Sequence, residues 1–298
     1  RVAIGAYGND GSASGAGHVR VYALSSGSWT QLGADINGEA SSDYSGYSVS
    51  MNSAGDRVAI GAHENDGTSS AAGHVRIYSY NGSAWTQLGS DIDGEAGSDN
   101  SGRSVSMNAA GDRVAIGANY NNGNGSTAGH VRVYEYSSGS WSQLGGDIDG
   151  EAGGDRSGWS ASMNAAGDRV AIGALYNDGN GTDAGHVRVY EYASGSWTQL
   201  GGDIDGEAVS DRSGISVSMN SAGDRVAIGA YYNDGTASEA GHVRIYSYNG
   251  SAWSKLGADI DGEAGADYSG YSVSMNSSGD RVAIGAYGND GSASGAGH

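Results

Sequence analysis

The chain has 298 residues, with 34 acidic side chains against 15 basic ones and a formal net charge of −19. This balance disfavours a nucleic acid or an anionic membrane surface as a partner, because phosphate binding needs clustered cations. There is no cysteine to form a disulfide framework and no apolar run long enough for membrane insertion as a helix. The 55 glycines have no three-residue period, and Val, Ile, Tyr and Trp recur regularly, which indicates a turn-rich all-β protein.

The first 33 residues contain three short runs in which apolar and polar side chains alternate. They are RVAIGA from Arg1, HVRVYAL from His18 and SWTQLG from Ser28, and each predicts a β-strand. A loop rich in Gly, Ser and Asn, residues 7–17, separates the first two runs. A fourth strand is predicted from Tyr47 to Asn52, and the three-residue link after it implies an antiparallel hairpin with the next RVAIGA.

The string RVAIGA returns every 56 residues, at Arg1, Arg57, Arg113, Arg169, Arg225 and Arg281. A fixed period predicts an array of one structural unit. A four-stranded sheet has two faces to cover, and radial packing of such sheets as the blades of a β-propeller covers both. A β-solenoid is less favoured, because its strands are parallel. We expect an all-β propeller with five four-stranded antiparallel blades, one of them split between the two termini, or an open superhelical array of the same blades.

The whole chain, residues 1–298, is expected to be a single repeat array. Complete blades are expected at residues 44–89, 100–145, 156–201 and 212–257, and the split blade combines residues 268–286 with residues 1–33.

The two ends of the sequence overlap, because residues 281–298 are identical to residues 1–18. Two copies of RVAIGA therefore compete for the place beside the inner strand at Tyr271, and the displaced copy would present an unpaired edge to another chain. We expect one period of a longer array, or a protomer that joins its neighbour head-to-tail. The opening at Arg1, inside a repeat, predicts a processed or excised piece. The candidate assembly strands are marked by Val2, Ile4, Val282 and Ile284.

The run SGYSVSMNSAGDRVAIGA, followed by GHVR, resembles the FG-GAP repeat of integrin α-subunit propellers, once per 56 residues over essentially the whole chain. The resemblance implies a blade order with S-V-S-M innermost, then RVAIGA, then HVRVY, and W-T-Q-L-G outermost. The chain departs from the family at the third residue of GAP, which is never Pro, and at the Phe before the Gly. Ser replaces that Phe at Ser45, Ser101, Ser157, Ser213 and Ser269.

The family's calcium-binding D-x-D-x-D-G loop corresponds here to residues 52–56, which carry too few carboxylates for six to eight oxygen ligands. The segment D-I-D-G-E offers more oxygens, with Asp99 four residues beyond the first copy, and calcium is the candidate cofactor there. The alternative is that the Asp residues cap turns and the Glu is solvated. The candidate ligands are Asp91, Asp93, Glu95, Asp147, Asp149, Glu151, Asp203, Asp205, Glu207, Asp259, Asp261 and Glu263.

Other repeated side chains are expected to be structural. Arg57 and its equivalents should pair with a carboxylate of a neighbouring loop, and the repeated Trp should fill space between blades. Histidines recur once per repeat, and we expect a ring nitrogen of each to bond the loop backbone rather than a metal. These histidines are His18, His74, His130, His186 and His242.

Two sets of loop residues remain as candidate sites. Aromatic residues that do not repeat are the better candidates for ligand contacts, namely Tyr7, Tyr120, Tyr176, Tyr231 and Tyr232. N-x-S/T sequons predict glycan acceptors in a secreting eukaryote, at Asn81, Asn124, Asn180, Asn249 and Asn276.

No catalytic constellation stands out, and a glycosidase would need a carboxylate pair placed once, whereas every candidate here is repeated. We therefore expect an extracellular or cell-surface module without enzymatic activity, for adhesion or structural assembly. Nearly identical blades suit avidity, so the partner would be a second copy of the chain or an extracellular protein or glycan. A multivalent carbohydrate-binding lectin is the alternative.

Overall fold

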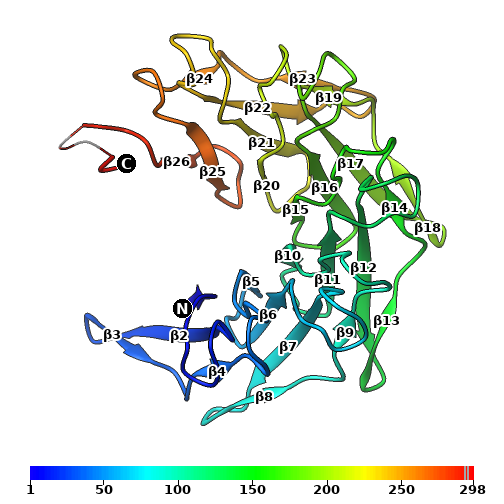
Figure 1. The fold of residues 1–298 in the computed structure, drawn as a ribbon, viewed down its shortest axis with the longest axis vertical. Helices are drawn as coiled ribbons and strands as arrows, with labels where there is room; N and C mark the ends of the chain where they lie inside the picture. The colour runs from blue at the N-terminus through cyan, green and yellow to red at the C-terminus, as the bar shows by residue number, and fades with distance from the viewer. Residues whose placement is uncertain (292, 294) are drawn as a thin grey trace.

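The computed structural model describes residues 1–291, 293 and 295–298, and all regular structure within them is β-strand. In this described part, no helix exists that is long and apolar enough to cross a membrane. The strands form antiparallel sheets that follow one another around an arc, and the two chain ends face each other across its opening (Figure 1). We call the sheets blades, numbered 1 to 5 in chain order, and the last two strands the terminal hairpin. The expected all-β propeller architecture is confirmed, and the solenoid is excluded.

Blade 2 shows the complete unit. Its strands are β5 (Ser48–Met51), β6 (Arg57–Ala62), β7 (His74–Tyr80) and β8 (Trp85–Gln87), paired in that order from the centre of the arc to its rim. A further short strand, β9 (Ile92–Asp93), pairs with the first two residues of β7. The outermost position is therefore shared by β8 and β9, and the sheet extends beyond residue 89, where the blade was expected to end.

Blades 3 to 5 repeat this pattern. Blade 3 contains β10 (Ser104–Met107), β11 (Arg113–Ala118), β12 (His130–Ser137), β13 (Ser140–Gln143) and β14 (Ile148–Asp149). Blade 4 contains β15 (Ser160–Met163), β16 (Arg169–Ala174), β17 (His186–Ala193), β18 (Ser196–Gln199) and β19 (Ile204–Asp205). Blade 5 contains β20 (Ser216–Met219), β21 (Arg225–Ala230), β22 (His242–Tyr248), β23 (Trp253–Lys255) and β24 (Ile260–Asp261).

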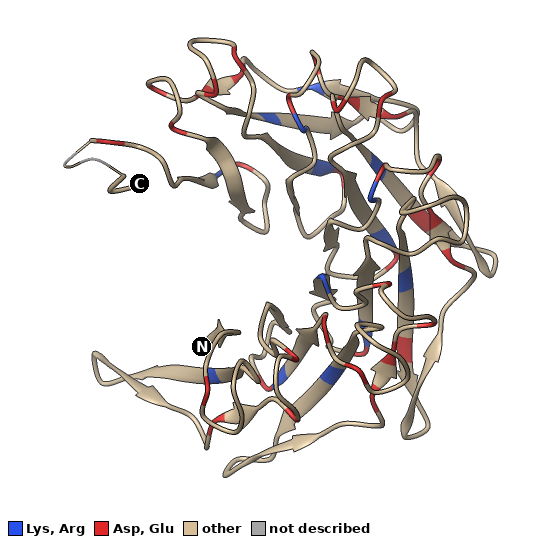
Figure 2. Ribbon diagram, in the orientation of Figure 1, with Lys and Arg blue, Asp and Glu red and all other residues tan. Residues whose placement is uncertain are grey.

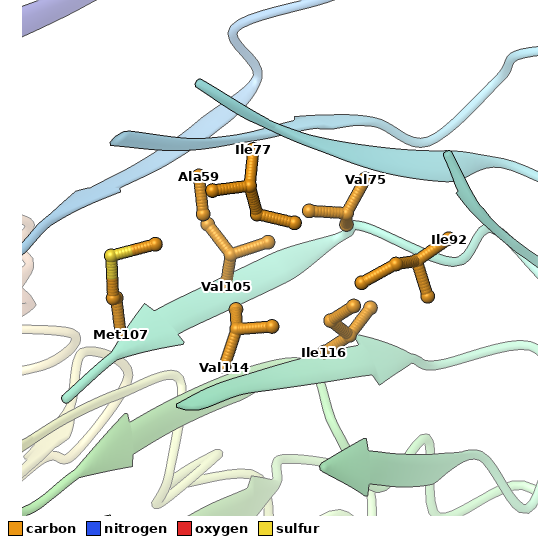
Figure 3. Close-up of a cluster of buried hydrophobic side chains, with 8 residues drawn as sticks. All are labelled: Ala59, Val75, Ile77, Ile92, Val105, Met107, Val114 and Ile116. Atoms are coloured by element: carbon orange, nitrogen blue, oxygen red, sulfur yellow. The ribbon is translucent and has the colours of Figure 1, made fainter. Parts of the chain in front are cut away.

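The hydrophobic core lies between blades rather than within them. Alternate side chains of a strand point to opposite faces of its sheet, so β6 buries Val58 and Ile60 against blade 1 and Ala59 against blade 3. Figure 3 shows the second of these clusters, in which residues of blade 2 meet residues of blade 3. Blades 2 to 4 thus have both faces covered by their two sequence neighbours, as the 56-residue period predicts.

Polar side chains also join neighbouring blades. The Trp85 indole Nε1 donates a 2.7 Å hydrogen bond to the Leu32 carbonyl of blade 1, and the equivalent Trp residues of blades 3 to 5 do the same. This confirms the expected blade-to-blade role of the repeated Trp. The expectation for Arg57 is wrong, since its Nη1 donates to the Gly111 carbonyl in the turn of the next blade at 2.9 Å. Among the equivalents, Arg113 and Arg169 also pair with a carboxylate, that of Glu135 or Glu191 within their own blade.

The split blade expected from residues 268–286 and 1–33 is not assembled. Blade 1 consists of β1 (Val2–Ala6), β2 (His18–Ser25), β3 (Ser28–Gln31) and β4 (Ile36–Asn37), with no inner strand. The terminal hairpin is a separate sheet of β25 (Ser269–Met275) and β26 (Val282–Ala286). β26 follows β25 through a short turn, so its pairing costs far less loop-closure entropy than the return of β1 from the other end of the chain.

Candidate functional site

The inner strands β5, β10, β15, β20 and β25 surround a central channel with two different ends. At one end, the methionine of each inner strand and the turn after it enclose a small cavity of about 220 Å³. At the other end the channel opens into a cavity of about 470 Å³, within the range of small-molecule sites. We call this wider end the channel mouth.

The channel mouth is lined by one position of the repeat at which the residue type varies. The residue before each S-V-S-M or S-A-S-M string lies there, and its identity changes from one repeat to the next while its neighbours stay the same. These lining residues are Tyr47, Arg103, Trp159, Ile215 and Tyr271. A repeat array that is nearly uniform elsewhere therefore presents one asymmetric surface.

The residues after each RVAIGA string extend this surface. Tyr7 packs against Tyr47 with ring centroids 5.3 Å apart, and at the opposite end of the array Tyr231 packs against Tyr271 at 5.6 Å. Tyr176 meets Trp159 edge-on at 6.5 Å. The mouth thus carries a belt of aromatic rings contributed by several blades.

Three arginines are inserted between the rings of this belt. The Arg103 guanidinium carbon lies 3.9 Å from the Trp159 ring centroid and 4.5 Å from that of Tyr47. Arg156 and Arg212 both lie over the ring of Tyr176, at 4.7 and 5.0 Å. Across the described residues, none of the three arginines forms an ion pair with a carboxylate. Burial lowers the pKa of Arg103 below its usual value, although the group stays charged at neutral pH.

His63 is the one histidine of the belt. The centroid of its ring lies 4.2 Å from that of Tyr47. The Arg103 guanidinium also lies over the Tyr47 ring. Burial, with a smaller effect of the Arg103 charge, lowers the pKa of His63 to about 4, so the imidazole is neutral at pH 7. The His63 Nδ1 atom is buried without a hydrogen-bond partner among the described residues.

Part of this site is predictable from the sequence. Of the five tyrosines expected to contact a ligand, Tyr7, Tyr176, Tyr231 and Tyr232 lie in the belt, and Tyr120 contacts Arg156 beside it. His63 and the three arginines were missed, as were the aromatic residues at the inner strands. A position-by-position comparison of the repeats would have identified these residues, because they occupy the positions at which the repeats differ.

The repeated histidines lie at the junctions between blades. His74 Nδ1 is 3.8 Å from an Asp91 oxygen of its own blade and 3.9 Å from a Glu39 oxygen of the preceding blade. His130 and His186 face carboxylates in the same way. The expectation that these rings bond the loop backbone is wrong for His74, His130, His186 and His242, because acidic side chains of two blades converge on them, while His18 of blade 1 belongs to no such set among the described residues. Burial lowers the pKa of His74, His130, His186 and His242 to about 4.

The acidic segments expected to bind calcium are distributed differently from the prediction. Asp91 belongs to one blade junction and Glu95 to the next, while Asp93 is in neither cluster that the described residues form. Burial together with the neighbouring Asp91 raises the pKa of Asp93, and Asp149 and Asp205 behave alike. Asp99 caps the turn before it, accepting hydrogen bonds from the Ala96 amide and the Asn121 side chain. Figure 2 shows the acidic residues mainly on loops and the rim of the arc.

The candidate glycan acceptors are in turns. In Asn124, Asn180 and Asn276 the side-chain nitrogen donates a hydrogen bond within the chain. Asn81 and Asn249 are exposed and accept backbone hydrogen bonds through their side-chain oxygens.

No protein-family model matches the sequence, and no curated protein is similar to it. Solved structures match it in fold. The Pseudomonas aeruginosa periplasmic gluconolactonase PpgL has a TM-score of 0.61 and 14% sequence identity, over 95% of this chain and 74% of that one. The Kuenenia stuttgartiensis hydrazine synthase has a TM-score of 0.58 and 13% identity, over 92% of this chain and 69% of that one. The chain is a β-propeller.

These matches correct the functional expectation. The prediction of an adhesion or assembly module, with a lectin as its alternative, depended on the likeness of the repeats to adhesion propellers. That prediction is wrong, because the two matching propellers named above are enzymes. The expectation of a chain without enzymatic activity likewise has no support from its fold. At such low identity the matches show the fold alone, so the activity must be argued from the site.

Proposed function

We propose that the channel mouth binds a small organic acid, whose carboxylate is received by Arg103. The observation that carries the proposal is the Arg103 guanidinium, held between two aromatic rings at the cavity without a carboxylate partner among the described residues. A partly buried cation without a counter-charge is unfavourable, and an anionic ligand relieves that cost. The planar guanidinium also matches the geometry of a carboxylate.

The remaining lining suits the rest of such a ligand. The aromatic rings of Tyr47, Trp159 and Tyr271 supply apolar walls, and the serines at the start of the inner strands supply hydroxyl groups. The lining thus combines aromatic rings with several polar groups, which suits a polar small molecule such as a hydroxylated acid.

The first experiment titrates gluconate into the full chain by calorimetry. We expect saturable binding with one equivalent, and Arg103→Ala should weaken it at least about tenfold, because a charge-assisted bidentate hydrogen bond is lost. Arg281→Ala is the matched control, since Arg281 is exposed and outside the mouth. No saturable binding, or equal binding by the wild type and Arg103→Ala, would show that the mouth is not this site.

A second candidate function is hydrolysis of the lactone of such an acid, and His63 is the observation that favours it. In this step a water oxygen attacks the lactone carbonyl carbon, and the neutral imidazole of His63 accepts the water proton. Arg103, on the same Tyr47 ring, stabilises the developing oxyanion, and the imidazolium returns the proton to the leaving alkoxide when the ring C–O bond breaks. The structural likeness to a gluconolactonase is consistent with this chemistry.

This second function is tested by following the opening of gluconolactone in a pH-stat. We expect hydrolysis faster than the spontaneous rate, which His63→Gln abolishes while gluconate binding is retained. A His63→Gln variant with the wild-type rate would reject the hydrolase and leave the binding site as proposed.

A further inference from the structure

Each junction between consecutive blades contains one histidine and two carboxylates that face one another. The Glu follows the last strand of one blade, whereas the His and the Asp come from the next blade. The potential ligand atoms of each set lie within 4.8 Å of one another. The four sets are Glu39, His74 and Asp91; Glu95, His130 and Asp147; Glu151, His186 and Asp203; and Glu207, His242 and Asp259.

The carboxylates of these sets are oriented by other side chains. Arg76 Nη1 lies 3.1 Å from Glu39 Oε1, which leaves Oε2 directed at His74 Nδ1. Gln87 donates to Asp91 Oδ1, which leaves Oδ2 directed at the same nitrogen. Hydrogen-bond partners of this kind orient the ligands of a metal ion toward it.

At His186 the nitrogen that faces the carboxylates has no hydrogen-bond partner in the described chain, although the side chain is only 1% exposed. The separation of 3.8 Å between His186 Nδ1 and Glu151 Oε2 is too long for a hydrogen bond. Two ligands at usual Zn–N and Zn–O lengths in a tetrahedral site lie about 3.4 Å apart. A small contraction of the junction would therefore place both atoms on one ion.

We propose that the blade junctions bind Zn²⁺ through Glu, His and Asp, and that the bound ions link consecutive blades. An imidazole nitrogen with two carboxylate oxygens suits Zn²⁺ better than Ca²⁺, which prefers six to eight oxygens. Three protein ligands leave a fourth position for water. The proposal does not depend on the ligand of the channel mouth.

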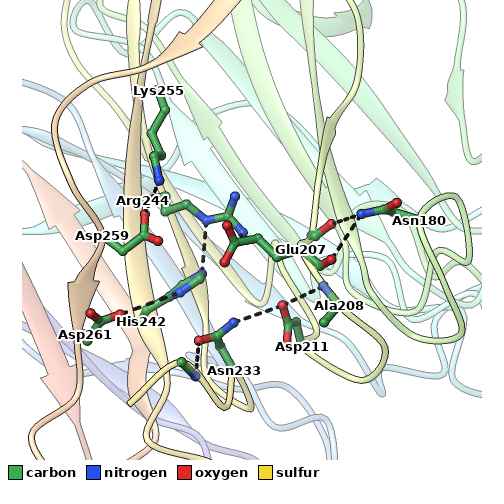
Figure 4. Close-up of polar contacts among 12 residues, drawn as sticks. Asn180, Glu207, Ala208, Asp211, Asn233, His242, Arg244, Lys255, Asp259 and Asp261 are labelled. Carbon is green, nitrogen blue, oxygen red and sulfur yellow. Dashed lines mark hydrogen bonds and ion pairs between the residues drawn. The ribbon is translucent and has the colours of Figure 1, made fainter.

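One junction differs from the others. Lys255 replaces the glutamine of the other repeats, and its ammonium lies 2.8 Å from Asp259 Oδ1 (Figure 4). Each set already has one arginine on its Glu, and here the ammonium adds a second positive charge, on the Asp, so the set of Glu207, His242 and Asp259 should bind Zn²⁺ more weakly than the others. Glu263 is the equivalent of these glutamates beside the terminal hairpin, and it belongs to no such set among the described residues.

The test is a calorimetric titration of the full chain with ZnCl₂, after removal of metals with a chelator. We expect three tight equivalents and one weaker, and far weaker binding of CaCl₂. Glu151→Gln changes a solvent-accessible side chain and should remove one tight equivalent, as should Asp203→Asn. Lys255→Gln should tighten the weak equivalent by roughly tenfold, because its competing charge is lost.

Glu263→Gln is the matched control, because it removes the same side chain at a place where the described residues form no complete set. Circular dichroism establishes that each variant is folded. The proposal is overturned if Zn²⁺ gives no saturable binding, if Glu151→Gln keeps all equivalents, or if Glu263→Gln loses a tight one.

Discussion

Five buried histidines make the stability of the folded chain sensitive to acid. Burial lowers their pKa from 6.5 to about 4 in the folded chain, at His63, His74, His130, His186 and His242. Between pH 6.5 and 4 the unfolded chain therefore binds more protons than the folded chain, and the free energy of unfolding falls as the pH falls. Each histidine contributes a slope of roughly 1.4 kcal/mol per pH unit in this window.

We expect urea unfolding in the presence of a chelator to show a stability that is constant above pH 7 and falls steeply from pH 6.5 to 4.5. His63→Asn should reduce the slope by about one fifth, because it removes one of the five histidines. His63 is chosen for this variant because it lies outside the blade junctions. A free energy of unfolding that does not change between pH 6.5 and 4.5 would contradict the buried, neutral state of these rings.

Single residues also show what the sequence could not reveal. The features that the repeats share set Tyr7 and Tyr231 apart as loop aromatics, but they do not distinguish Arg103 and His63. The blade-junction sets were beyond reach for another reason. Glu39 and Asp91 belong to consecutive repeats, and only the packing of one blade on the next determines that they converge.

At the scale of strands, the glycine of RVAIGA determines how closely two blades approach. A Cβ on Gly117 would collide with the Gly158 carbonyl of the next blade and with the Ser104 hydroxyl. The Gly158 carbonyl and the Ser104 hydroxyl both belong to the inner part of a blade and have little room to move. Gly117→Ala should therefore lower the free energy of unfolding by roughly 1–3 kcal/mol, the usual cost of overpacking.

The matched control is Gly285→Ala, at the same position of the motif in the terminal hairpin. A Cβ there would meet the Ser272 side chain but no carbonyl of a following blade. Urea unfolding of the two variants should therefore give a clearly larger loss for Gly117→Ala. Equal losses would show that the glycine serves the strand itself and not the packing of blades.

The strands themselves were largely predictable. Alternation placed RVAIGA at residues 57–62, which coincide with β6, and the hairpin links gave the antiparallel order. The short strand β9 was missed, because Ile92 and Asp93 lie in a segment whose Asp and Gly residues indicate a turn. Ile92 is buried in the core between blades 2 and 3, and this tertiary packing outweighs the local preference.

At the scale of the whole molecule, the opening of the arc leaves two faces that every other repeat buries. On blade 1, Val2 is 39%, Ile4 51% and Trp29 55% exposed, although the Trp of each later blade donates to a carbonyl of the blade before it. On blade 5, Leu256 and Ile260 are exposed where their equivalents are covered. The two faces are complementary, because Leu256 is the repeat equivalent of Leu32, which accepts the Trp85 hydrogen bond.

The duplicate strand β26 occupies the edge of β25 that β1 could take, and we expect this pairing to be what keeps the two faces apart. We expect a chain shortened to residues 1–280, which contains five whole repeats, to close into a ring in which β1 pairs with β25. Closure buries Val2, Ile4 and Trp29 and removes both free sheet edges, a gain that offsets the entropy of joining the termini. Small-angle scattering should then give a smaller radius of gyration than for the full chain, and the β1 amides should become protected from hydrogen exchange. If the shortened chain kept the scattering profile of an open arc and unprotected β1 amides, competition between the two copies of RVAIGA would not be what holds the arc open.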